Sequence, residues 1–99
     1  MKLMMVQAEI KPECVDEIEA AGRKLFSAIE RERPQGLRYA SCRLPDGVTY
    51  LNLLALDDGV ENPLPALPEA GEFQAGLKGW LAEPATSRSL TIIGSYRLF

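Results

Sequence analysis

The sequence predicts an α+β fold: a ferredoxin-like β-α-β-β-α-β two-layer sandwich with an antiparallel sheet. Four segments have the alternating or β-rich pattern of strands, namely 2–10, 37–44, 48–56 and 89–99. Two segments, 12–33 and 69–83, have the three- and four-residue apolar spacing of amphipathic helices. Each helix must bury one apolar stripe and the strands can offer an apolar face, which favours a helical layer on a sheet.

The first strand and the first helix follow one another directly. Residues 2–10 alternate, so one face carries Met4, Val6, Ala8 and Ile10 and the other carries Leu3, Met5, Gln7 and Glu9. Pro12 suits the first turn of a helix, and the acids that follow it lie near the positive end of the helix dipole. Pro34 and Gly36 end this helix, since the residue before a proline is pushed away from helical geometry.

A hairpin is predicted at the centre of the chain. Segments 37–44 and 48–56 are rich in aliphatic, aromatic and β-branched residues, and Pro45, Asp46 and Gly47 separate them. Proline fixes φ, aspartate bonds nearby backbone and glycine accepts a positive φ. A three-residue hairpin loop is therefore expected.

The last third of the chain supplies the second helix and the last strand. Three prolines, Pro63, Pro65 and Pro68, exclude regular structure from a stiff connecting loop, which is also a candidate lid over a cavity. Helix 69–83 follows and is weakened by three glycines, and Pro84 closes it. Residues 89–99 alternate again and predict a final strand.

Size and composition limit the classes of function. Ninety-nine residues make one domain, 1–99, and 46% hydrophobic with 25% charged residues is ordinary for a globular protein. A net charge of −3 without a basic cluster argues against a nucleic-acid partner, and no segment is long enough to span a membrane. Cys14 and Cys42 have no metal-binding or redox spacing, so we expect two reduced cysteines in a cytoplasmic protein, with a disulfide as the alternative.

The sheet face turned away from the helices is expected to be half apolar. Its apolar members are expected to be Leu3, Met5, Leu37, Tyr39, Tyr50, Leu54, Ile93 and Phe99. Its polar members are expected to be Gln7, Glu9, Ser41, Arg43, Asn52, Thr91, Ser95 and Arg97. Because a patch of this kind is too large to leave in water, we expect a second subunit to cover it, sheet facing sheet. The polar members would then line a cavity between or within the two sheets.

The chain resembles the dimeric α+β barrel superfamily, and within it the antibiotic-biosynthesis monooxygenase-like group. The resemblance covers nearly the whole chain and is carried by the order of elements, by the hairpin and by three short segments: Ile10-Lys11-Pro12-Glu13, Phe73-Gln74-Ala75-Gly76-Leu77 and Ile92-Ile93-Gly94-Ser95-Tyr96-Arg97. It implies a homodimer that binds a small apolar or aromatic molecule, with no cofactor and no metal. The chain has no histidine, so it lacks the axial ligand expected of a heme-degrading relative. Gln7 stands where such enzymes often carry asparagine.

Eight residues are candidates for a site in this barrel. For an oxygenase, the resemblance implies that Asn52, Tyr50 and Arg97 would orient a substrate hydroxyl or oxyanion. The candidate cavity residues are Gln7, Glu9, Tyr39, Arg43 and Trp80. Each also has an ordinary structural role open to it, such as an amide satisfied by cross-barrel hydrogen bonds, an aromatic cross-strand pair, a core tryptophan or a neutralised charge pair.

Two functions of different classes follow from these observations. The first is a cofactor-independent monooxygenase acting on a small aromatic or quinol-like molecule. The second is a ligand-binding or structural dimer with no chemistry, in which the polar cavity residues satisfy one another. Oxygen uptake with quinols separates the two.

Overall fold

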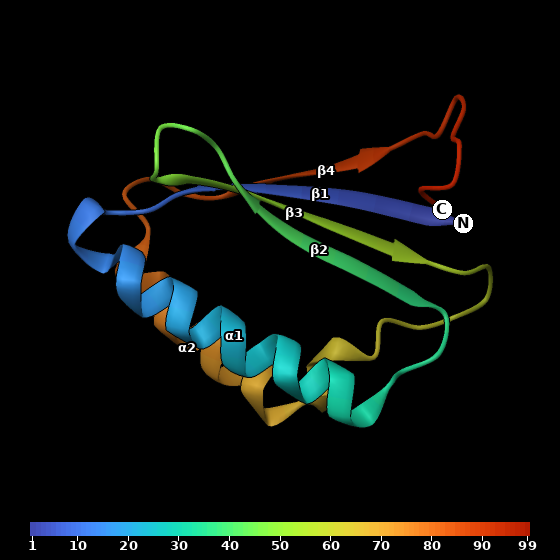
Figure 1. The fold of residues 1–99 in the computed structure, drawn as a ribbon, viewed down its shortest axis with the longest axis horizontal. Helices are drawn as coiled ribbons and strands as arrows, with labels where there is room; N and C mark the ends of the chain where they lie inside the picture. The colour runs from blue at the N-terminus through green and yellow to red at the C-terminus, as the bar shows by residue number, and fades with distance from the viewer.

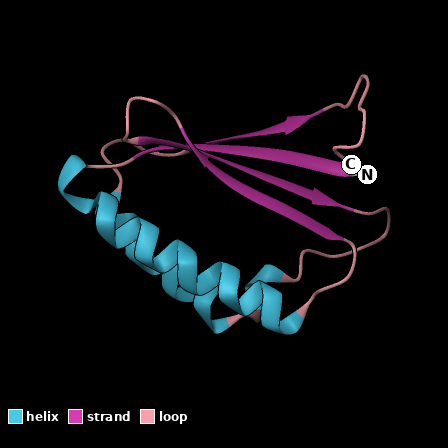
Figure 2. Cartoon of the chain, in the orientation of Figure 1, coloured by secondary structure: helices cyan, strands magenta, loops and turns pink.

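The computed structural model describes all 99 residues and confirms the β-α-β-β-α-β order (Figures 1 and 2). The strands are β1 (Lys2–Glu9), β2 (Leu37–Arg43), β3 (Thr49–Leu56) and β4 (Thr86–Leu90). The helices are α1 (Val15–Glu32) and α2 (Pro68–Trp80), with short 3-10 turns η1 (Pro12–Cys14) and η2 (Leu64–Ala66). The sheet has the order β2-β3-β1-β4, and every neighbouring pair is antiparallel. Both helices lie on one side of it (Figure 1).

The core lies between the helices and the sheet. Ile10 at the end of β1 is fully buried, and it meets Ile18 and Leu25 of α1 and Phe73 of α2 in one buried cluster. Hydrogen bonds from Lys11 N to Trp80 O and from Ala82 N to Glu9 O, both 2.9 Å, tie the end of α2 to the end of β1. These bonds draw the chain into an extended conformation at Leu81, so α2 ends three residues before the predicted limit at 83.

The predicted faces of β2 and β3 are wrong. Val6 and Ala8 of β1 border the space under α1, and so do Tyr50 and Asn52, their partners on β3. Because side chains alternate along a strand, this helix-facing side also carries Leu37, Tyr39, Ser41, Arg43 and Leu54. The expectation had placed Tyr50, Asn52 and these five residues on the opposite side, whereas the faces of β1 were predicted correctly.

The uncovered face is defined by the other residues of each strand, and we use this name for it below. Its members on β1 are Leu3, Met5, Gln7 and Glu9, as predicted, and their partners on β3 are Ala55, Leu53, Leu51 and Thr49. Met5, Leu51 and Leu53 are only half-buried, and Leu90 at the edge is exposed. No helix packs on this side (Figure 1).

The last strand is shorter than predicted and begins earlier. β4 runs from Thr86 to Leu90 and pairs with β1 from Gln7 back to Leu3, whereas a strand was expected over 89–99. Leu90 lies opposite Leu3, so β1 has almost no residues left to bond a longer antiparallel partner. Residues 91–99 therefore form neither strand nor helix, and Ile93 and Arg97 lie outside the sheet. Arg97 has φ +59, which no extended strand allows.

Asp46 organises the turn between β2 and β3. Its Oδ1 accepts hydrogen bonds from the backbone N–H groups of Val48 and Thr49, both 2.9 Å, and its Oδ2 accepts one from Thr49 Oγ1 at 2.6 Å. The Thr49 side chain and the two amides lower the pKa of the Asp46 carboxyl below its ordinary value. A carboxyl with a lowered folded pKa stabilises the fold above its unfolded pKa, and that stability is lost as the pH falls through the folded value.

We therefore expect Asp46→Asn to destabilise the protein at neutral pH and to matter less in acid. Asparagine keeps one acceptor oxygen but presents an amide donor where Thr49 needs an acceptor. Urea unfolding of both proteins, at neutral pH and at a pH below the pKa values of carboxyl groups, measures the difference between their free energies of unfolding. Asp57→Asn is the control, since the Asp57 carboxylate makes no hydrogen bond or ion pair. If the free-energy difference is the same at both pH values, the stabilising role of the ionised Asp46 carboxylate is contradicted.

Gly76 leaves room for the indole of Trp80 one turn later in α2. A methyl group at Gly76 would lie 2.6 Å from Cζ2 of that ring, whereas one at Gly79 would meet nothing within 4 Å. Gly79→Ala should therefore stabilise the helix by up to about 1 kcal/mol. Gly76→Ala should stabilise the helix less than Gly79→Ala does, or destabilise it. It should also shift the fluorescence emission of the single tryptophan, since the ring must move. Emission spectra that are the same for both variants and for the wild type would show that the contact is absent.

Candidate functional site

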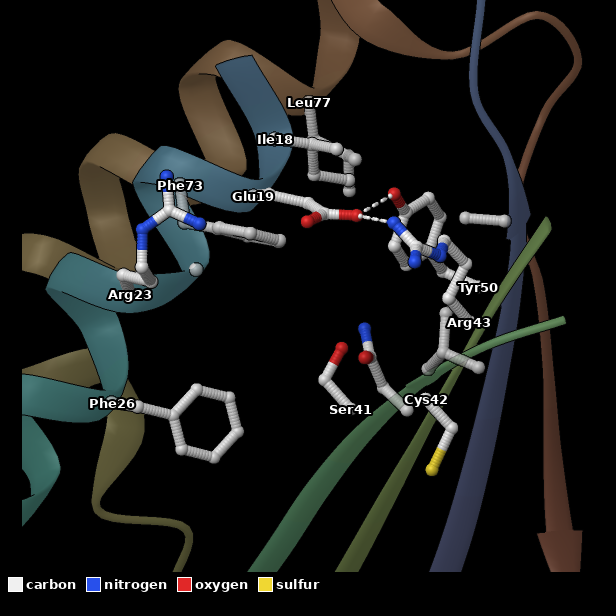
Figure 3. A pocket seen from close by; sticks show the side chains of 14 residues that line it. Ile18, Glu19, Arg23, Phe26, Ser41, Cys42, Arg43, Tyr50, Phe73 and Leu77 are labelled. Atoms are coloured by element: carbon white, nitrogen blue, oxygen red, sulfur yellow. Dashed lines mark hydrogen bonds and ion pairs between the residues drawn. The ribbon is translucent and has the colours of Figure 1, made fainter. Parts of the chain in front are cut away.

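A cavity of about 510 Å³ lies between α1 and the helix-facing side of the sheet, with α2 at its back (Figure 3). Its size suits a small organic ligand. Its larger apolar wall residues come from β1 and both helices: Val6, Ala8, Ile18, Phe26, Phe73 and Leu77. Its polar residues come from α1, β2 and β3: Glu19, Arg23, Ser41, Arg43, Tyr50 and Asn52. The site is an apolar slot with a polar border.

Two short bonds at one end of the cavity converge on a single carboxylate. Glu19 Oε2 accepts a hydrogen bond from Tyr50 Oη and another from Arg43 Nη1, both at 2.6 Å (Figure 3). Glu19 comes from α1, Arg43 from the end of β2 and Tyr50 from the start of β3. These three residues, named the Glu19 cluster, join the helix layer to the hairpin.

The Glu19 cluster fixes the protonation of its own members. The hydrogen bond from Tyr50, followed by that from Arg43, lowers the pKa of the Glu19 carboxyl. Burial, together with the bond to the Glu19 carboxylate, raises the pKa of the Tyr50 phenol. Near neutral pH the carboxylate is ionised, with both hydrogen bonds on Oε2, and the phenol is protonated. The lowered pKa makes the Glu19 carboxylate a weak general base, and the protonated phenol cannot accept a proton.

Asn52 places an unsatisfied acceptor in the wall of the cavity. Its Oδ1 is buried and has no hydrogen-bond partner. A buried carbonyl oxygen without a partner costs about 1–3 kcal/mol, so most native structures avoid one. Asn52 lies on β3 opposite Ser41 of β2 and Val6 of β1, and all three border the cavity. A donor on a bound molecule would satisfy this oxygen once the amide turns it toward the cavity, since the oxygen is out of contact with solvent in this conformation.

Aromatic rings close the cavity on two sides. Phe26 of α1 stacks on Tyr39 of β2, with ring centroids 5.2 Å apart and planes 13° apart. Phe73 of α2 packs edge-on against Trp80 at 6.3 Å. Burial raises the pKa of the Tyr39 phenol, so this ring is also neutral. Flat apolar walls of this kind favour a flat ligand.

The structure brings together only part of the predicted site. Asn52, Tyr50 and Arg43 border the cavity, and Tyr39 lies next to it behind Phe26. Trp80 is outside the cavity, behind Phe73, where it packs against the core. Three residues lie elsewhere: Gln7 and Glu9 are exposed on the uncovered face, and Arg97 covers the ring of Tyr96 in the C-terminal segment.

Sequence reasoning missed the contribution of α1. Glu19, Arg23 and Phe26 are not among the residues that the sequence singled out. All three follow one another at spacings of three or four residues, and Gly22 lies between them on the same side of the helix. The signal was available as a second, polar-aromatic stripe beside the apolar one.

The structure offers no group of three His, Cys, Asp or Glu side chains that could hold a metal ion. Cys14 and Cys42 are both free. Neither helix has the length and apolar character needed to cross a membrane.

Comparison with known proteins identifies the fold. No protein-family model matches the sequence, and no curated protein matches it either. Among solved structures, an antibiotic biosynthesis monooxygenase is similar with a TM-score of 0.75 and 16% identity, over 95% of this chain and 100% of that one. Rv0793 from Mycobacterium tuberculosis is similar with a TM-score of 0.72 and 16% identity, over 95% of this chain and 96% of that one. PA3566 from Pseudomonas aeruginosa is similar with a TM-score of 0.72 and 15% identity, over 94% of this chain and 95% of that one.

These likenesses extend over whole chains, although identity is low. They bear out the resemblance drawn from the sequence at the level of architecture, including the single helical layer on a four-stranded antiparallel sheet. This chain therefore has the ferredoxin-like fold that these solved structures share.

Proposed function

We propose that this protein is a cofactor-independent monooxygenase that acts on a small aromatic or quinol-like molecule in the cavity beneath α1. The observation that carries the proposal is the unpartnered Oδ1 of Asn52 in the wall of an otherwise largely apolar cavity. A phenolic hydroxyl donates to such an oxygen, and the aromatic ring then lies against Phe26, Phe73 and the aliphatic walls. The similarity to a solved antibiotic biosynthesis monooxygenase is consistent with this chemistry.

The reaction needs no base from the Glu19 cluster if the substrate is electron-rich. With 1,4-dihydroxynaphthalene, one oxygen atom of O2 forms a new C–O bond on the ring and the other leaves as water. The substrate supplies the electrons, and the product is 2-hydroxy-1,4-naphthoquinone. The protein would bind and orient the quinol through Asn52 while the apolar walls exclude water. Arg97 lies outside this cavity, so the role expected for it is not part of the proposal.

The test is incorporation of label from ¹⁸O₂ into 2-hydroxy-1,4-naphthoquinone. Label in the product distinguishes oxygenation from simple autoxidation, which gives the unhydroxylated quinone and peroxide. Asn52→Leu, similar in volume but without the acceptor, should lower the rate about five- to tenfold. Gln74→Ala, an amide removed from the exposed side of α2, should leave it unchanged. No label in the product with any electron-rich phenol tried would contradict the oxygenase.

A second function, binding without chemistry, is favoured by one specific observation. The only carboxylate of the cavity is ionised and held by two donors, and the phenol beside it is protonated. The lowered pKa makes Glu19 a weak base, which disfavours proton removal near neutral pH. Saturable binding of 1,4-dihydroxynaphthalene with no ¹⁸O incorporation would favour this function.

We also infer that the protein is a homodimer that pairs through its uncovered faces. Met5, Leu51 and Leu53 are half-buried there without any covering helix, and Leu90 extends the apolar surface to the sheet edge. Association of two copies would remove this surface from water and gain the corresponding hydrophobic free energy. The free Cys14 and the exposed, free Cys42 suit a reducing compartment, which supports a cytoplasmic location.

A further inference from the structure

Arg23 is a guanidinium at the cavity that has no carboxylate partner. It lies one helical turn after Glu19 on α1 and borders the same cavity, but it has no ion pair within 4.0 Å. Glu19 is already engaged by Tyr50 and Arg43. In Figure 3 the Arg23 side chain lies along the α1 wall, and Ser41 lies on the sheet wall across the cavity.

The acids on the other side of Arg23 do not form an ion pair with it. Arg23 also borders a shallow groove between the helices, where Glu69 and Glu72 of α2 lie. Glu69 Oε2 pairs with Arg31 at 3.3 Å and its Oε1 has no partner, and neither acid lies within 4.0 Å of Arg23. The cavity border thus carries two guanidinium groups and one carboxylate, which leaves one positive charge in a protein whose net charge is −3.

Two unmet groups therefore face one slot from different elements. Arg23 on α1 offers a charged fork of N–H donors, and Asn52 on β3 offers an acceptor oxygen without a partner. A guanidinium binds a carboxylate with paired, charge-assisted hydrogen bonds. A carbonyl oxygen needs a donor such as a hydroxyl.

We propose that the cavity selects a flat aromatic molecule that carries a carboxylate and a hydroxyl at opposite ends. Arg23 binds the carboxylate at the border, the ring fills the slot against Phe26 and Phe73, and the hydroxyl donates to Asn52 Oδ1. This rests on the proposed function for its location in the cavity, and it adds the charge and the polarity pattern of the ligand.

The test uses three fluorescent probes that differ by one group. The first is 6-hydroxy-2-naphthoate, which has both groups; 2-naphthol has only the hydroxyl, and 2-naphthoate has only the carboxylate. Affinities are measured by fluorescence titration with the full chain at low salt. The wild type should bind 6-hydroxy-2-naphthoate roughly fivefold more tightly than 2-naphthol, a modest gain because Arg23 is exposed to solvent.

Arg23→Gln should abolish this preference and leave 2-naphthol binding unchanged, and Arg23→Lys should restore part of it. Asn52→Leu should weaken both hydroxylated probes and spare 2-naphthoate. Lys24→Gln is the matched control, because it removes the same charge from an exposed neighbour that does not border the cavity. Circular dichroism confirms that each variant is folded.

Three results would overturn the inference. Equal affinity for 2-naphthol and 6-hydroxy-2-naphthoate would show that the carboxylate is not recognised, while the cavity itself would stand. An equal loss in Lys24→Gln and Arg23→Gln would assign the preference to the general field of α1 rather than to Arg23. Failure of all three probes to bind would contradict the cavity as a ligand site, and the proposed function with it.

Discussion

Replacing Leu53 by glutamate should turn the proposed dimer into monomers. Leu53 lies on β3, a central strand, and its neighbours across the sheet are Met5 on β1 and Ala40 on β2. All three point to the uncovered face. In a sheet-to-sheet dimer a carboxylate here would be buried without a partner in each copy, which costs several kcal/mol. The dimer dissociation constant should rise by at least about a hundredfold.

Sedimentation velocity of wild type and Leu53→Glu across a range of concentrations measures this change. Gln74→Glu is the control, since it adds the same charge to the exposed side of α2, away from the uncovered face. Wild type and Gln74→Glu should sediment as dimers and Leu53→Glu as a folded monomer. A wild type that is monomeric at every concentration would show that the uncovered face is not a dimer interface.

Replacing Ile10 by alanine should produce the largest loss of stability of any single truncation considered. Ile10 is fully buried, packs in the cluster of both helices and lies at the end of β1, where its N–H donates to Val48 O at 2.9 Å. Truncation of a buried isoleucine removes packing and leaves a cavity, at a cost of about 2–5 kcal/mol. The free energy of unfolding of a domain of this size is about 5–15 kcal/mol, so this substitution removes a large share of it.

The chain offers a matched control at Ile93, whose side chain is 98% exposed. Ile93→Ala makes the same chemical change without loss of core packing, so it should alter the free energy of unfolding by less than about 0.5 kcal/mol. Guanidinium-induced unfolding of the three proteins measures both effects. Equal destabilisation by the two substitutions would contradict the assignment of the core.

The fold could be predicted because its signals are strong and local. The spacing of Ile18, Gly22, Leu25 and Ile29 predicts α1, and Pro45, Asp46 and Gly47 predict the turn that Asp46 organises. Helix ends were less predictable. Hydrogen bonds between the end of α2 and β1 set the end of α2, and residues so far apart in sequence give no local sign of it.

The faces of β2 and β3 could not be predicted, and this displaced the candidate site. β3 is apolar at nearly every position, from Tyr50 to Leu56, so its sequence does not distinguish a core face from an open one. A shift of one residue moves every side chain to the other face. In the single chain the cavity lies between the sheet and α1, where Asn52, Tyr50 and Arg43 border it and Gln7 and Glu9 do not. The cavity expected between or within two sheets stays a prediction.

The central claim is that the cavity beneath α1 is the ligand site, and chemical-shift mapping tests it most directly. Uniformly ¹⁵N-labelled protein is titrated with 2-naphthol, and amide shifts are followed by two-dimensional NMR. We expect the largest shifts at Gly22, Ser41 and both amides of Asn52, all of which border the cavity. Largest shifts at Gln7, Leu51 and Leu53, on the uncovered face, would contradict the claim.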